Sequence, residues 1–171
     1  MLTNSAKYAI KALACLARQP ADAPPVPIGD IARAEKIPRK FLERILLQLN
    51  RDGFLYSKRG PDGGYGLARP VAAIMLGDLI RRIDGPLAPI PCVSVTAYRP
   101  CPDCADESSC GLRLVMKGVR DAIAGILDHT SLADMQNLSD TVRTALAEAR
   151  TAPPSARRRA SKTSRTKPRS P

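Results

Sequence analysis

Apolar residues recur every three or four positions in several stretches of the chain, which is the spacing of an amphipathic helix. The first stripe, formed by Ile10, Leu13, Ala14 and Ala17, excludes the charged Lys7, Lys11 and Arg18 from its face. Proline-rich or glycine-containing segments separate the stripes and mark where helices end. The helices that this spacing predicts lie at 4–18, 28–34, 38–50, 74–84, 111–128 and 132–150.

The helix predicted at 38–50 has one apolar face and one polar face. The apolar positions are Phe41, Leu42, Ile45, Leu46 and Leu49. The opposite positions are Arg39, Lys40, Glu43, Arg44 and Gln48. A short helix, a tight turn and a second helix with an exposed basic face form a helix-turn-helix, whose second helix enters the major groove of DNA. Charge on one face alone favours an ordinary solvated helix, so the interpretation depends on the segment directly after this helix.

A β-hairpin is predicted in that segment. Its strands are 54–57 and 65–69, and between them stands Pro61-Asp-Gly-Gly64, in which proline presets φ and we expect the glycines to supply positive φ. Lys58 and Arg59 enter the tip of the hairpin. A hairpin in this position is the wing of a winged helix-turn-helix, and Arg59 could enter a narrow minor groove.

These elements predict a mostly α fold with four parts. A winged helix-turn-helix of three helices and a wing occupies residues 1–84, and a cysteine-rich loop occupies 85–110. A long helix from Gly111 and a C-terminal helix follow in 111–150. Such a long helix on a small domain would expose its apolar stripe unless it met a partner, so we expect a symmetric homodimer; the alternative is packing of the stripe within one chain.

The charge of the chain is +11, and it is uneven. Residues 151–171 hold seven of the 27 basic residues and no acid, together with four prolines and no large apolar residue. We expect this tail to be disordered, serving either as a solubilising tail or as a nonspecific DNA tether. A basic chain favours a polyanion as its partner. No apolar run is long enough to span a membrane, and the first 20 residues do not resemble a secretory signal, so we expect a cytoplasmic protein.

Four of the five cysteines lie between Cys92 and Cys110, spaced C-x8-C-x2-C-x5-C. Clustered thiols in a reducing compartment bind metal or sense redox state more often than they form structural disulfides. Four thiolates suit a [2Fe–2S] or [4Fe–4S] cluster, or zinc, although only Cys101 and Cys104 form the close pair typical of structural zinc. A metal-free thiol switch is the third option. Acidic residues in the loop would raise the thiol pKa values and disfavour it.

Enzyme function finds little support in this sequence. It offers one histidine, no serine–histidine–aspartate arrangement, and no glycine loop that opens a helix around a phosphate. The competing class is a small iron–sulfur electron-transfer protein. Such a protein has no use for a basic helix and wing, so DNA binding would distinguish the two.

Three motifs together resemble the IscR/NsrR/RirA family of bacterial winged-helix regulators over roughly residues 1–140. The motifs are Ile28-Gly-Asp-Ile-Ala with Phe41-Leu-Glu-Arg-Ile-Leu, the wing Arg59-Gly-Pro-Asp-Gly-Gly-Tyr-Gly-Leu-Ala-Arg69, and Met75-Leu-Gly-Asp-Leu-Ile-Arg-Arg-Ile-Asp-Gly-Pro86 before the cysteine loop. The resemblance implies a homodimeric regulator, here expected to be a repressor, on an inverted-repeat operator in double-stranded DNA. In many members of this family the loop cysteines hold an iron–sulfur cluster that senses iron, redox state or nitric oxide.

Carried onto this sequence, the resemblance implies two sets of site residues. The DNA-binding set is Arg39, Lys40, Glu43, Arg44, Lys58, Arg59, Gly63, Gly64 and Tyr65. The implied cluster ligands are Cys92, Cys104 and Cys110, and the extra thiol of Cys101 makes an all-cysteine site an option. Arg113 stands where one branch of the family has a histidine ligand. Glu43 could accept a hydrogen bond from cytosine N4, or it could pair with Arg39 or Lys40 on its own helix.

Overall fold

The computed structural model describes residues 2–20, 22–104 and 106–151. The chain divides into a unit that ends at Met135 and a second unit that begins at Gln136, and each is described by itself. The elements, with η for a short 3-10 helix, are α1 Asn4–Ala17, α2 Ile28–Glu35, α3 Arg39–Arg51, β1 Leu55–Lys58, β2 Gly64–Leu67, η1 Val71–Ala73, α4 Leu76–Asp84, η2 Pro91–Val93, α5 Gly111–Leu127 and α6 Leu132–Thr151. The mostly helical winged fold that the sequence predicts is thereby confirmed.

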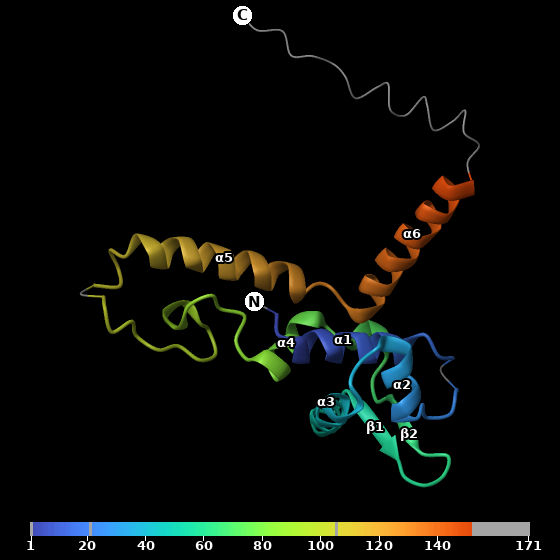
Figure 1. Cartoon of the computed structure of the whole chain (residues 1–171). Coiled ribbons are helices and arrows are strands. Elements are labelled where there is room, and N and C mark those ends of the chain that lie inside the picture. Colours follow the sequence, from blue (N-terminus) through green and yellow to red (C-terminus); the bar gives the residue numbers. More distant parts are fainter. Residues whose placement is uncertain (1, 21, 105, 152–171) are drawn as a thin grey trace, which may run out of the picture. The chain divides into compact units, whose positions relative to one another are not determined.

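The core of the first unit is mostly aliphatic, with Phe54 also buried in it, and lies between α1, α2, α3 and α4 (Figure 1). Leu13, Ile31, Leu46 and Leu79 are completely buried there, as the helical spacing of their apolar neighbours predicts. Phe41 departs from the prediction because its side chain is 38% exposed. It lies at the edge of the buried arc of α3 and meets the ring of Tyr8 edge-on, with the ring centroids 5.7 Å apart.

The turn between α2 and α3 is tight because Lys36 adopts the left-handed conformation, with φ 53°. The backbone N–H of Ile37 then donates to Ala32 at 2.9 Å, and its side chain fills the core. Pro38 is extended, with ψ 125°, and is the N-cap of α3. The prediction that Pro38 is the first residue of the helix is therefore off by one position.

The wing is a two-stranded antiparallel hairpin with Tyr56 opposite Gly66. Val26, in the segment before α2, pairs with Tyr65 through two backbone hydrogen bonds of 2.9 Å, so the wing is tied to the rest of the domain. In the turn, Gly60 has the expected positive φ of 115°, whereas Gly63 and Gly64 do not.

The second half of the first unit begins with α4, which starts at Leu76 and not at Ile74 as predicted. Ile74 is instead a buried connector whose carbonyl accepts from the N–H of Leu132 at 2.8 Å. A capping box begins α6 at Ser131, since the N–H of Asp134 donates to the Ser131 hydroxyl at 3.1 Å and Asp134 accepts from the N–H of Ser131 at 2.9 Å.

Helix α5 has no buried residue, and the cysteine loop lies beside it (Figure 1). Its apolar stripe is exposed, and the members of that stripe are Leu112, Val115, Val119, Ile123 and Ile126. The second unit contains the rest of α6, which also exposes Leu138, Val142 and Leu146. The basic tail predicted to be disordered lies, beyond Thr151, outside the described residues.

Candidate DNA-binding surface and cysteine loop

Helix α3 turns its charged residues away from the core. Its buried positions are Leu42, Ile45, Leu46 and Leu49, and the four residues predicted to contact DNA, Arg39, Lys40, Glu43 and Arg44, are all exposed. The sequence left open whether Glu43 pairs with a basic residue of its own helix. It pairs with Arg39, whose Nε lies 3.3 Å from Glu43 Oε1. The two side chains are 67% and 49% exposed, and an ion pair on such a surface is weak enough to open for another partner.

Two further residues of α3 share this face and were missed by the sequence prediction. Leu47 is 49% exposed, and Arg51 is exposed one turn further along. They follow Lys40 by seven and eleven positions, which is the same helical stripe. The predicted helix ended at Asn50, and a leucine in a charged stripe was not read as part of a contact surface.

The wing carries its two basic residues, Lys58 and Arg59, fully on the outside. The glycines of the wing are fixed by close packing. A Cβ on Gly63 would lie 2.6 Å from the Lys58 carbonyl oxygen, and a Cβ on Gly64 would overlap the backbone of Val26. Tyr65 is half-buried and pairs with Val26. These three residues therefore shape the wing.

The cysteines of the loop differ in their surroundings. Cys92 is buried in η2, while Cys101, Cys104 and Cys110 are half-exposed, and all four are free thiols. The Cys104 thiol interacts with those of Cys110 and Cys101, and these contacts raise the pKa of Cys104 to about 12. The expected cause, neighbouring acidic residues, is not what raises it. In the described part of the chain, no three His, Cys, Asp or Glu side chains are arranged as a metal site.

Thiolates are the ligands that iron–sulfur clusters take, and the loop supplies four thiols, of which Cys104 contacts two others, although in the described residues they are not arranged as a metal site. Cys110 is the N-cap of α5, and its side chain makes no capping hydrogen bond. The backbone N–H of Arg113 nevertheless lowers the pKa of the Cys110 thiol, as do weaker contacts with Cys104 and Leu112. A helix N-terminus favours the thiolate form, which is the form that ligates metal.

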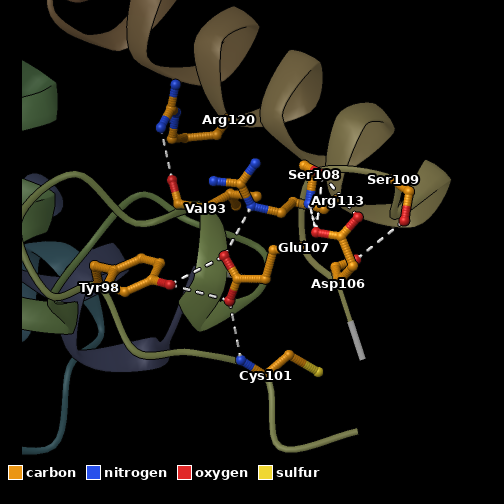
Figure 2. A network of polar contacts seen from close by, with 9 residues as sticks. All are labelled: Val93, Tyr98, Cys101, Asp106, Glu107, Ser108, Ser109, Arg113 and Arg120. Carbon is orange, nitrogen blue, oxygen red and sulfur yellow. Dashed lines mark hydrogen bonds and ion pairs between the residues drawn. The ribbon is translucent and has the colours of Figure 1, made fainter. Parts of the chain in front are cut away.

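Glu107 organises the loop around these thiols, and it was not singled out as a site residue from the sequence (Figure 2). The Tyr98 hydroxyl reaches both carboxylate oxygens at 3.0 Å, and the Cys101 N–H donates to Oε1 at 3.3 Å. Arg113 Nε lies 3.4 Å from Oε2 as an ion pair, and this buried nitrogen makes no hydrogen bond. One carboxylate thus joins the start of α5 to the backbone of a cysteine.

Asp106 forms a separate small cap next to Glu107 (Figure 2). The hydroxyl and N–H of Ser108 donate to its carboxylate, and these bonds lower the pKa of Asp106 to about 2. The Ser109 hydroxyl donates to the Asp106 carbonyl at 3.4 Å. The acidic residues of the loop therefore hold its backbone in shape.

Three polar contacts connect the loop to α3. Arg120 of α5 donates to the Val93 carbonyl, next to Cys92, at 2.7 Å (Figure 2). Asp128, which follows α5, accepts two hydrogen bonds of 2.6 and 2.8 Å from Arg81 of α4. Gln48 of α3 donates to the Arg82 carbonyl of α4 at 2.7 Å. The Cys92 turn, α5, α4 and α3 are thus in continuous contact.

The arrangement of helix, wing and helix-turn-helix defines the class of winged-helix DNA-binding proteins. The sequence model of the Rrf2 family, described as an iron-dependent transcriptional regulator, matches residues 2–138. The chain belongs to this family. The expected family of regulators, and the expectation of a regulator in place of an enzyme, are confirmed by this match.

Individual relatives agree with this assignment. The chain is 43% identical over 137 residues to a Rhodobacter capsulatus protein named as an rrf2-like HTH-type transcriptional regulator, covering 79% of this chain and 91% of that protein. It is 28% identical over 144 residues to the HTH-type transcriptional regulator IscR of Yersinia pseudotuberculosis, covering 84% of each.

Solved structures with this fold are also similar. CymR, the global cysteine regulator of B. subtilis, matches with a TM-score of 0.67 and 27% identity, over 81% of this chain and 97% of that one. IscR of T. potens matches with a TM-score of 0.63 and 26% identity, over 81% and 88%. Separately, none of the helices in the described ranges has the length and apolar character to cross a membrane.

Proposed function

We propose that this chain is a homodimeric repressor that binds an inverted-repeat operator and senses iron, redox state or nitric oxide through an iron–sulfur cluster on its loop. The observation that carries the proposal is the polar connection between the cysteine loop and the DNA-binding helix through Arg120, Asp128–Arg81 and Gln48. As a regulator of transcription it would act in the cytoplasm.

The recognition surface supports sequence-specific DNA binding. Exposed Arg39, Lys40 and Arg44 can donate to guanine, and Glu43 can accept from cytosine once its bond to Arg39 opens. Lys58 and Arg59 of the wing lie where phosphate or minor-groove contacts are made in winged proteins. Base edges would be read by α3, and the wing would fix its register.

Cys92, Cys101, Cys104 and Cys110 are the residues that would hold the cluster, through their thiolates. A bound cluster of either type, [2Fe–2S] or [4Fe–4S], supplies a centre that responds to oxidants and to iron supply. The chain's own part is to bring four thiols into one loop and to present Cys110 at the start of α5. Glu107 keeps the Cys101 backbone in place.

Coupling to DNA would follow from the fixed contacts around the loop. Arg120 holds the Val93 carbonyl, and therefore the Cys92 turn, against α5. The paired oxygens of Asp128 hold α4 to the end of α5, and α4 in turn accepts from Gln48 of the recognition helix. A rearrangement of the loop would therefore bias α3, and couplings of about 1–3 kcal/mol are enough to change operator affinity about 5- to 150-fold.

A second candidate is a metal-free or zinc-dependent thiol switch on the same regulator. The contacts of Cys104 with Cys101 and Cys110 favour it, because a two-electron oxidant such as a peroxide would take two electrons and two protons from either pair and leave a disulfide within the loop. Zinc would need the same thiolates and would hold the loop without redox chemistry.

One preparation tests these alternatives. The full-length protein is purified without oxygen, its visible spectrum is recorded, and iron and zinc are assayed on the same sample. We expect a brown protein that contains iron and that enriches an inverted repeat from a random duplex library. A colourless zinc protein would favour zinc as the group that the loop holds, and a colourless metal-free protein would favour the thiol switch. A protein that enriches no sequence would refute the DNA-binding proposal.

Matched cysteine variants sharpen this experiment. Cys104→Ala removes the thiol that contacts two others, so we expect it to fold, dimerise and lose its iron. Cys15→Ala is the control, because Cys15 is buried in α1 within the core cluster. Loss of iron from both variants, or from neither, would contradict the ligand assignment.

A further inference from the structure

Leu47 lies in the middle of the exposed face of α3. It is 49% exposed, and its neighbours on that stripe are Lys40, Glu43, Arg44 and Arg51. The core side of α3 is already filled by four buried residues, among them Leu46, which precedes Leu47 in the sequence. Leu47 therefore contributes little to packing within this chain, and a polar residue would be the usual occupant of such a position.

The surroundings of Leu47 are suited to DNA. Arg44 and Arg51 lie three positions before it and four positions after it, and Lys40 lies seven positions before it. Basic side chains on both sides match the phosphates that line a groove. Gln48, the next residue along, already donates to the Arg82 carbonyl.

The major groove presents one conspicuous apolar group, the 5-methyl group of thymine, and apolar side chains contact it. We infer that Leu47 reads thymine in the operator by contact with this methyl group. The inference rests on the proposed operator binding by α3 and goes beyond it, because it assigns one base identity to a residue with no hydrogen-bonding group.

The test uses the full-length protein and the operator that it enriches from random duplexes. Each thymine is replaced in turn by deoxyuridine, which pairs identically and lacks only the methyl group. We expect one thymine position whose replacement weakens binding by about fourfold in one half-site and about 15-fold in both, since burying one such carbon group contributes about 0.8 kcal/mol.

The decisive comparison is with Leu47→Ala, which keeps the helix because alanine is a strong helix former. We expect this variant to bind the thymine and deoxyuridine operators equally. Leu2→Ala is the matched control, since Leu2 is 47% exposed and lies outside α3, and it is expected to keep the discrimination.

Two outcomes would overturn the inference. One is a wild-type protein whose operator binding is unchanged by deoxyuridine at every position. Leu47 would then be exposed for contact with a protein and not with DNA. The other is a Leu47→Ala variant that still discriminates. In both cases enrichment of an operator shows that DNA binding itself stands, whereas enrichment of no sequence removes the operator and this inference together.

Discussion

At the scale of single residues, Gly63 and Gly64 of the wing are required because other backbone atoms lie where a Cβ would be. The sequence predicts glycine in the turn, because Pro61-Asp-Gly-Gly64 is turn chemistry, but the reason it suggests is positive φ. Only Gly60 has that conformation among the described residues of this turn. Gly64 is needed because the Val26 backbone lies against it, a contact between segments 38 residues apart in sequence that no local pattern encodes.

Gly64→Ala is therefore expected to destabilise the protein. Its Cβ would overlap the Val26 carbonyl group, so the two backbone hydrogen bonds between Val26 and Tyr65 would have to shift. Overpacking of this kind costs about 1–3 kcal/mol in free energy of unfolding, measured by urea denaturation. Gly29→Ala is the control, since nothing lies within 4 Å of its Cβ position and alanine favours helix α2. Equal effects of the two substitutions would show that Val26 does not constrain Gly64.

Residues that act through hydrogen bonds in the loop were the hardest to predict. The four cysteines are visible as a cluster because their spacing is unusual. Glu107 is one acid among several, and its role depends on the loop conformation that brings Tyr98, Arg113 and the Cys101 N–H around one carboxylate. Irregular backbone has no period from which such a meeting can be inferred.

At the scale of elements, helices were predicted well because burial imposes a period on them. α1, α2 and α3 agree with their predicted bounds within a residue or two, and each buries at least one apolar residue. The contact between α4 and α5 could not be predicted from that period. It depends on Arg81 and Asp128, which lie 47 residues apart, and on Gly77, where any side chain would meet the Asp128 carboxylate.

This contact predicts a pH-dependent contribution to stability. The hydrogen bonds from Arg81 hold the pKa of the Asp128 carboxyl below its usual range. A carboxyl whose pKa is lowered by folding stabilises the protein above its unfolded-state pKa, and that stabilisation is lost as the pH falls through the folded-state pKa. Because Asp128 is 37% exposed, solvent limits the contribution to about 1 kcal/mol or less.

Asp128→Asn should therefore lower the free energy of unfolding at neutral pH, and the difference from wild type should shrink in acid. Urea denaturation at a series of pH values measures both effects. Asp140→Asn is the matched control, because the Asp140–Arg143 pair is about two-thirds exposed on each side and is expected to contribute little at any pH. A difference for Asp128→Asn that does not change with pH would rule out the ion pair as its cause.

At the scale of the whole molecule, the exposed stripe of α5 is the main feature that one chain leaves unsatisfied. Leu112, Val115, Val119 and Ile126 recur on one side of the helix at spacings of three, four and seven, which is the pattern of a helix that pairs with another. Two copies joined along this stripe would present two α3 helices to successive major grooves about 34 Å apart, as an inverted repeat requires.

Ile126→Glu tests that assembly. Its side chain is 67% exposed, so the substitution costs little in the single chain, whereas pairing would bury two unpaired carboxylates. We expect the dimer dissociation constant, measured by sedimentation equilibrium, to rise about 100-fold or more, since about 2.7 kcal/mol corresponds to that factor. Operator affinity should fall as the dimer dissociates, because one recognition helix then has to bind without that of the second copy.

Leu114→Glu distinguishes a paired stripe from general apolar contact. Leu114 is 58% exposed and lies on the opposite side of the same helix, so this variant should remain dimeric. If both variants dissociate, the surface that joins two chains is broader than the stripe. If neither does, α5 is not the dimer helix, and the spacing of the two recognition helices must be set elsewhere in the chain.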